Sequence, residues 1–270
     1  MERGHEGSLL AKHRQSGRED QVRPRMDLTP DGQSLILRSP SMTAPTLTVV
    51  IMAYNEAASL GAVWDEIQTE LERTGVTYEI LLVDDGSTDG TAEICDALAK
   101  VHPIGRVIHH RPNQGLGGVY RTGFREARGT WLTFFPADGQ FPATIIGQYL
   151  AHLDGTDMIL GYLPERDGPL TGKLLSLAER RLFRALFGYF PKFQGILMFR
   201  RSLLDKHPLV SQGRGWTVLM EFILRATRGG AIHTSLPIQL RPRQSGHSKV
   251  NNLRSVASNL RQVLALWRRL

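Results

Sequence analysis

Short apolar runs alternate with amphipathic segments along most of this chain. Four runs have the length and composition of strands, at residues 45–53, 80–83, 106–109 and 131–135. Between them lie segments with apolar residues at helical spacing, such as residues 59–73, where one face carries Leu60, Val63, Trp64, Ile67 and Leu71. Alternating strands and helices favour a parallel sheet with right-handed crossovers. We therefore expect an α/β protein with a mainly parallel central sheet flanked by helices.

The second half of the chain is less regular. Strands are predicted at residues 158–160 and 231–240, and residues 194–201 are predicted as a strand that turns into the start of a basic helix. A further helix is predicted over residues 216–228. Two further helices, over residues 173–190 and 252–269, carry an apolar stripe and recurring arginines on another face. Each stripe either packs against the domain or lies on a membrane interface, and the pattern leaves both open.

The start of the chain has a different character. Its first 43 residues are polar and basic and show no sustained period, which is typical of a disordered tail. We expect three parts: a disordered basic tail over residues 1–43, one domain over residues 44–250, and a C-terminal amphipathic helix over residues 251–270.

Charge narrows the class of partner. The 270 residues carry a formal charge of +7 and a pI of about 9.8, which favours an anionic partner such as a nucleotide-sugar phosphate, a lipid phosphate or an acidic membrane surface. No nucleic-acid-binding motif is recognised, and no stretch approaches the roughly 18 apolar residues that span a bilayer. The single Cys95 excludes an internal disulfide. We expect a cytoplasmic protein, either free or attached peripherally to the cytoplasmic face of a membrane.

Two acids follow the strand at residues 80–83 without a break. Asp84 and Asp85 open the turn DDGSTDG, which leads into a helix. In open α/β sheets, ligands bind at this carboxyl edge of the strands. Carboxylates there can accept hydrogen bonds from a base N–H or from ribose hydroxyls, whereas bare phosphate would need a cation between. The alternative is that both acids only cap the turn.

A second polar pair follows the strand at residues 131–135. In the segment PADGQFP, Asp138 and Gln140 stand on alternate residues just past the strand end. Two oxygen ligands at this spacing can grip one hard divalent cation. The alternative is that Asp138 only starts a turn.

A basic loop lies near the end of the domain. The segment RPRQSGHSK, residues 241–249, gathers two arginines, a histidine and a lysine around a glycine. Arginine forks and a lysine charge attract a pyrophosphate. The alternative is a solvated basic loop.

Taken together, the motifs VVIMAYNEAASL, EILLVDDGSTDGT, RPNQGLGGVYRTGFREARG, PADGQFP and RQSGHSK resemble, in the same order, those of the family 2 glycosyltransferases of GT-A fold. Within that family the likeness is to the dolichyl- or polyprenyl-phosphate sugar transferases. It covers about residues 45 to 249 and implies a GT-A nucleotide-diphospho-sugar transferase fold.

The resemblance also implies roles for particular residues. The base and ribose of a nucleotide-sugar would be held by Ala53, Tyr54, Asn55 and Glu56 together with Asp84 and Asp85. Asp138 and Gln140 would coordinate Mg²⁺ or Mn²⁺ on the diphosphate, and Arg243 and Lys249 would neutralise it. The family's metal motif is usually Asp-x-Asp, and here Pro136 stands at the first position.

The reaction implied is an inverting transfer of a sugar from GDP-mannose or a UDP-sugar to a polyprenyl phosphate at a membrane surface. One alternative is a soluble transferase whose acceptor is a hydroxyl of a glycan or small molecule, which would need a general base, and Glu221 is the candidate. Another is a nucleotide-binding module without turnover, which Pro136 suggests. No nucleic-acid partner is expected.

Overall fold

The structure is a computed structural model that describes residues 44–164, 181, 183–242 and 261–268. The predicted tail at residues 1–43, the basic loop with Arg243 and Lys249, and the first parts of the helices predicted over residues 173–190 and 252–269 lie outside these residues.

One seven-stranded sheet forms the centre of the molecule. Its strands are β1 (Leu47–Ala53), β2 (Tyr78–Asp84), β3 (Gly105–His109), β4 (Trp131–Pro136), β5 (Met158–Tyr162), β6 (Leu197–Arg200) and β7 (His233–Pro237). Their order is β3-β2-β1-β4-β6-β5-β7. Every neighbouring pair is parallel except the two made by β6, which runs against both β4 and β5. The expected mainly parallel sheet is thus confirmed.

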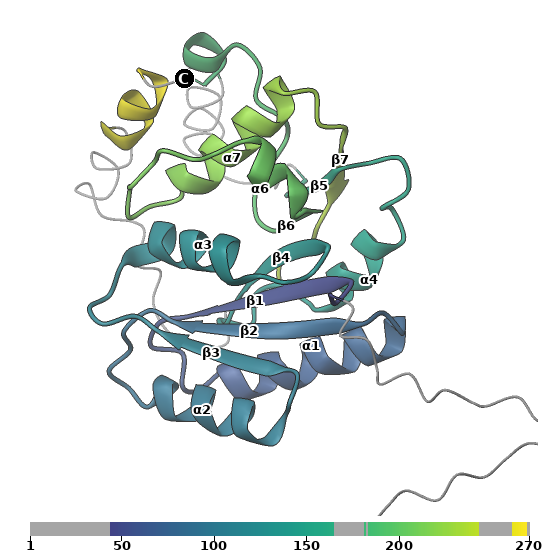
Figure 1. The fold of residues 1–270 in the computed structure, drawn as a ribbon, viewed down its shortest axis with the longest axis vertical. Coiled ribbons are helices and arrows are strands. Elements are labelled where there is room, and N and C mark those ends of the chain that lie inside the picture. Colours follow the sequence, from purple (N-terminus) through teal and green to yellow (C-terminus); the bar gives the residue numbers. More distant parts are fainter. Residues whose placement is uncertain (1–43, 165–180, 182, 243–260, 269–270) are drawn as a thin grey trace, which may run out of the picture. The chain divides into compact units, whose positions relative to one another are not determined.

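Helices cover both faces of this sheet (Figure 1). They are α1 (Leu60–Thr74), α2 (Thr91–Val101), α3 (Gly115–Glu126), α4 (Thr144–Leu150), α6 (Ser202–Lys206) and α7 (Thr217–Arg228). One core cluster joins the sheet to α1 and α4 and includes Cys95 of α2, and a second joins its other face to α3 and α7. The result is a three-layer α/β/α domain.

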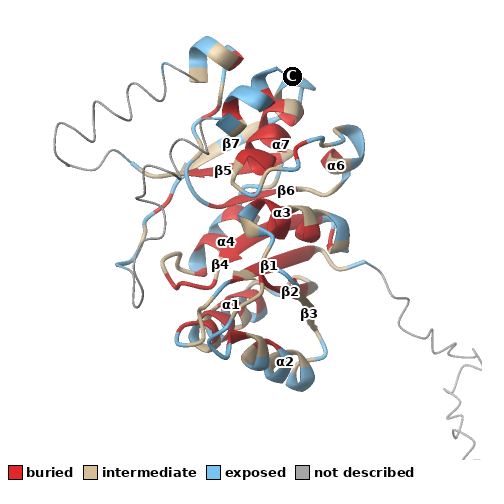
Figure 2. Cartoon of the chain, turned by 90° about the vertical axis from the view of Figure 1, so that its left-hand side faces the viewer, coloured by how far each residue is buried: buried red, intermediate tan, exposed pale blue. Residues whose placement is uncertain are grey.

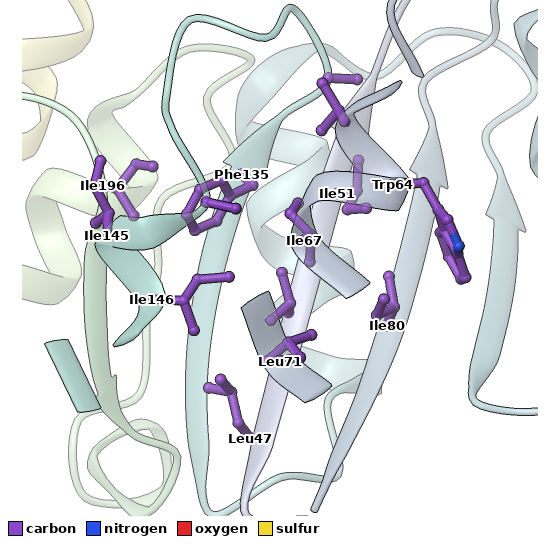
Figure 3. Packing of buried hydrophobic residues seen from close by; sticks show 14 of the residues in the cluster. Leu47, Ile51, Trp64, Ile67, Leu71, Ile80, Phe135, Ile145, Ile146 and Ile196 are labelled. Atoms are coloured by element: carbon purple, nitrogen blue, oxygen red, sulfur yellow. The ribbon is translucent and has the colours of Figure 1, made fainter. Parts of the chain in front are cut away.

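The uninterrupted apolar runs follow from this layering. In β1, Val49 and Ile51 pack toward α1 while Val50 packs toward α3, so every position except the half-buried Met52 is buried on one face or the other. The central strands are accordingly coloured as buried in Figure 2, whereas α2 presents exposed surface. Figure 3 shows the first cluster, in which Ile67 of α1 and Ile146 of α4 lie over the same face of the sheet.

A third, smaller hydrophobic cluster joins α7 to the C-terminal helix. It consists of Phe187, Met220, Leu224, Val263 and Leu266, with Trp216 packed against it. Residues 261–267 are helical, and Val263 and Leu266 are buried on this side while Leu264 and Trp267 remain exposed. The described end of the C-terminal amphipathic helix therefore packs against the domain through part of its apolar stripe.

Some elements differ from the sequence prediction. Helix α4 spans only seven residues and was not predicted. The strand expected over residues 194–201 narrows to Leu197–Arg200, and the strand expected over residues 231–240 narrows to His233–Pro237. Among the described residues, no helix is long and apolar enough to cross a bilayer.

Candidate functional site

The carboxyl ends of the parallel strands meet at one edge of the sheet. The register places Ala53 of β1 beside Asp84 of β2, and Asp84 beside His109 of β3. The Ala53 carbonyl accepts the N–H of Asp85 at 2.9 Å, and the Met52 carbonyl accepts the N–H of Ala137 at 2.9 Å. The acidic turn and the turn with Asp138 therefore flank the end of β1 on its two sides.

The loops after β1 and β2 are tied together by side chains of the DDGSTDGT motif. The Asn55 N–H donates to Ser87 Oγ at 3.0 Å, and Asn55 Oδ1 accepts the N–H of Thr88 at 2.9 Å. The Glu56 N–H donates to Thr91 Oγ1 at 2.9 Å. Asn55 adopts a positive φ of 54°, a conformation that asparagine tolerates better than most residues. The motif thus fixes the backbone of the segment predicted to hold the base.

Asp84 is fully buried and paired. Its Oδ1 accepts the N–H of Ser87 at 2.9 Å, and its Oδ2 lies 2.9 Å from His109 Nδ1 and 3.4 Å from Arg111 Nη1. Burial would raise the pKa of Asp84, but the hydrogen bonds from Ser87 and His109 hold it below its ordinary value. Burial likewise opposes the charged form of His109, yet its bonds to Asp84 and Asp96 raise its pKa. This acid stabilises the turn that carries the site.

Asp85 is also buried, and it fixes the start of α3. Its Oδ1 lies 2.7 Å from His110 Nδ1 and accepts the N–H of Gln114 at 2.8 Å, while its Oδ2 accepts the N–H of Gly115 at 2.9 Å. On the far side of the imidazole, His110 Nε2 lies 2.8 Å from Thr122 Oγ1. Asp84 therefore caps the turn that it opens, which was the alternative to ligand binding, whereas Asp85 caps the start of α3. A ligand would use the acceptor capacity that remains on these carboxylates.

The glycines at the start of α3 face other parts of the chain. A Cβ on Gly115 would lie 2.6 Å from the carbonyl oxygen of Arg214, and one on Gly117 would lie 2.1 Å from that of Gly213. The guanidinium of Arg214 donates to the carbonyl and the side chain of Asn113, at 2.9 and 2.7 Å. These glycines let the segment at residues 213–215 approach α3 closely.

Asp138 and Gln140 lie in the turn after β4. Asp138 is almost fully buried, its Oδ1 accepts the N–H of Gln140 at 3.1 Å, and it has further interactions. The Gln140 carbonyl accepts the N–H of Arg241 at 2.8 Å. The Arg241 side chain forms a bidentate ion pair with Glu66 of α1. Arg241 is therefore held by a carboxylate of the protein.

Two further residues of the predicted site, Tyr54 and Glu221, differ in how far they are buried. Tyr54 is exposed and has interactions of its own. Glu221 is fully buried and accepts the N–H groups of Val210 and Ser211 at 3.0 and 2.8 Å, and it pairs with Arg225 at 2.7 Å. Burial would raise the pKa of Glu221, but these bonds hold it below its ordinary value. A role as general base would require Glu221 to break them.

Sequence reasoning missed several residues at this edge. His109 and His110 lie at the carboxyl end of β3 just as Asp84 and Asp85 lie at that of β2, so the same rule could have found them. Glu66 gives no local signal, because its partners lie 77 and 175 positions away. Among the described residues, no three His, Cys, Asp or Glu side chains gather as a metal cluster.

Known proteins share both the sequence pattern and the fold. Residues 48–207 match the family model described as Glycosyl transferase family 2. The chain is 25% identical over 241 residues to the dolichol-phosphate mannosyltransferase of Mycosarcoma maydis, covering 84% of this chain and 80% of that protein. It is 29% identical over 240 residues to the polyprenol monophosphomannose synthase of Mycolicibacterium smegmatis, covering 83% and 87%.

Solved structures bear out the fold. The glucosyl-3-phosphoglycerate synthase from Mycobacterium tuberculosis, solved with Mn²⁺, UDP and glucosyl-3-phosphoglycerate, superposes with a TM-score of 0.60 at 21% identity over 82% of this chain and 78% of that one. The mannosyl-3-phosphoglycerate synthase from Rubrobacter xylanophilus gives a TM-score of 0.59 at 23% identity, over 83% and 74%. At these identities the likeness concerns the fold alone.

Proposed function

The chain belongs to glycosyl transferase family 2, and from this we propose that it transfers a sugar from a nucleotide-sugar, GDP-mannose or a UDP-sugar, to a polyprenyl phosphate at a membrane surface. The relatives named for dolichol-phosphate and polyprenol phosphate transfer support this acceptor class. The net charge of +7 agrees with a partner that carries phosphate.

The hydrogen bond between the Arg241 N–H and the Gln140 carbonyl carries the proposal. It joins the chain leaving β7, two residues before Arg243, to the turn that holds Asp138. Strand β7 is parallel to β5, so its carboxyl end lies at the same edge of the sheet as those of β1, β2 and β4. The start of the basic loop and the acidic turns thereby share one region. Arg243 and Lys249, which would neutralise the diphosphate, lie outside the described residues.

The donor base and ribose would bind along the segment from Ala53 to Glu56. The hydrogen bonds that Asn55 and Glu56 donate to Ser87 and Thr91, and the one that Asn55 accepts from Thr88, keep this segment in one conformation before the donor arrives, which lowers the ordering cost of binding. Asp85 Oδ2 accepts one N–H and, as a carboxylate oxygen, has capacity for a second donor such as a ribose hydroxyl.

Asp138 and Gln140 would hold a divalent cation. One carboxylate and one carboxamide form an oxygen-only donor pair of the kind that Mg²⁺ and Mn²⁺ accept, with the rest of the coordination left to substrate and water. When bound, the cation would supply positive charge to the diphosphate as it leaves. The solved relative that contains Mn²⁺ and UDP supports this cofactor class.

The chemistry is a displacement at the anomeric carbon. A bond forms from the acceptor oxygen to that carbon as the bond to the diphosphate oxygen breaks, and the nucleoside diphosphate leaves with the electron pair. A phosphate acceptor is already ionised and needs no strong base, whereas a hydroxyl acceptor does. The buried, fully paired Glu221 is therefore easier to reconcile with a phosphate acceptor.

The test is transfer of radiolabelled sugar from GDP-mannose or UDP-glucose to a polyprenyl phosphate in vesicles. We expect label in the organic phase and release of one nucleoside diphosphate per sugar transferred. Label found only on water-soluble glycan or small-molecule acceptors would favour the alternative transferase. Nucleotide binding without any release of nucleoside diphosphate would favour a module without turnover.

A further inference from the structure

Glu66, a half-buried residue of α1, holds two separate segments next to the turn that carries Asp138. Its Oε1 accepts the N–H of Ala143 at 3.1 Å, and both of its oxygens accept bonds from the Arg241 guanidinium, at 2.8 and 2.9 Å. The backbone N–H of Arg241 in turn donates to the Gln140 carbonyl at 2.8 Å.

These contacts fix the turn at residues 138–143 at two points. Gln140 is held by the backbone of Arg241, and Ala143 is held by the Glu66 carboxylate. Inside the turn, Asp138 Oδ1 accepts the N–H of Gln140. The relative placement of the Asp138 and Gln140 side chains therefore depends on the ion pair between Glu66 and Arg241, two residues that lie outside the turn.

We propose that Glu66 and Arg241 are positioning residues for the cation site, holding Asp138 and Gln140 at the spacing that one divalent cation requires. This inference rests on the proposed function, in which these two side chains are the protein's donors. With only one carboxylate among them, the affinity for the cation depends strongly on how well the donors are placed in advance.

A purely structural role explains the pair less well. The side chains of Arg241 and Glu66 are 43% and 35% exposed, and ion pairs this exposed contribute little to stability. Helix α1, which carries Glu66, and helix α4, which directly follows Ala143, are already joined by apolar packing, since Ile67 of α1 and Ile146 of α4 share one core cluster (Figure 3). Loss of the pair should therefore disturb the turn more than the fold.

The experiment measures Mn²⁺ affinity of the full chain, with UDP and separately with GDP, from the electron paramagnetic resonance signal of free Mn²⁺. We expect Glu66→Gln to weaken Mn²⁺ binding about tenfold while the midpoint of thermal unfolding stays nearly unchanged. The matched control is Glu70→Gln, which breaks the bidentate Glu70–Arg73 pair one turn further along α1. It should leave the Mn²⁺ affinity within about twofold of the original protein.

Arg241→Gln provides the second arm. If Glu66 and Arg241 act through their mutual ion pair, Arg241→Gln and the double variant should each lose about as much Mn²⁺ affinity as Glu66→Gln alone. The losses of Mn²⁺ affinity in the two single variants should then not add in the double variant. Unchanged Mn²⁺ affinity in Glu66→Gln would overturn the inference and leave the proposed function standing. Absence of nucleotide-dependent Mn²⁺ binding by the unaltered protein would instead refute the proposed cation site, and this inference with it.

Discussion

At the residue scale, the proposed chemistry depends most on Asp138. Replacing it with alanine removes the only carboxylate of the proposed cation pair, so we expect sugar transfer to fall by roughly 100-fold or more. The side chain lies in a turn rather than in the apolar clusters, so the fold should persist. Transfer assays paired with circular dichroism check both points. An Asp138→Ala protein with full activity would rule out the cation assignment.

Asp84 and His109 give a second prediction at this scale, on the pH dependence of stability. The pKa of Asp84 is lowered in the folded protein, so the contribution of Asp84 to folding stability is lost as the pH falls through that lowered pKa. The pKa of His109 is raised above about 6.5, so the contribution of His109 to folding stability is lost as the pH rises through that raised pKa. The pair therefore stabilises the fold most in the mildly acid range between them.

Replacing His109 with glutamine should lower the free energy of unfolding by about 1–2 kcal/mol at pH 5.5 and by clearly less at pH 9. Urea titrations at the two pH values measure the difference. His152→Gln, on an exposed site far along the chain, is the control and should show no such pH dependence. An equal loss at both pH values would mean that the charge on His109 does not matter.

At the element scale, the close approach of α3 to residues 213–215 depends on a residue without a side chain. A Cβ on Gly117 would lie 2.1 Å from the Gly213 carbonyl oxygen and 2.8 Å from that of Gly215. Because both neighbours are backbone, they cannot rotate away, and Gly117→Ala should destabilise the domain by about 1–3 kcal/mol. Thermal or denaturant unfolding provides the measurement.

Gly61 of α1 supplies the matched comparison. A Cβ there meets nothing within 4 Å, so Gly61→Ala should be neutral or should stabilise the helix by about 0.5–1 kcal/mol. If both alanine variants unfold alike, the close contact at Gly117 does not constrain the fold.

The same elements show what the sequence could and could not predict. The layered sheet was predictable because a strand buried on both faces, such as β1, needs an unbroken apolar run, and both acidic turns were predictable because they directly follow such runs. Helix α4 is too short to show a period. The partners of Gly117 and Glu66 could not be predicted, since they are brought together only by the folded chain and not by any local pattern. For Glu221, only the pair with Arg225, four residues further along the same helix, has a local signal.

At the scale of the whole molecule, the net charge of +7 favours anionic membranes. We expect the full chain to sediment with vesicles that contain acidic lipids at low ionic strength and to be released at about 0.5 M salt, where charge interactions are screened within a few ångströms. Vesicles of zwitterionic lipid are the control. A protein that stays in the supernatant with both would favour a water-soluble acceptor.

Nucleotide binding stabilises the folded state of the whole molecule, so thermal unfolding can show which donor the protein prefers. A donor present at about 100 times its dissociation constant should add about 2.7 kcal/mol to the free energy of unfolding. A thermal-shift panel of UDP- and GDP-sugars, with and without Mn²⁺, should therefore show one base raising the melting temperature more in the presence of the metal. Equal shifts with and without the metal would argue against a bridging cation.

The reversed direction of β6 has a consequence for the segment that joins β5 to β6. Leu160 near the end of β5 pairs with Leu197 at the start of β6, so the chain departs from the sheet and rejoins it on the same rim. An insertion there of any length or composition returns to its starting side without threading through the layers. The segment between β5 and β6 can thus change in length while the strands on either side of it keep their register.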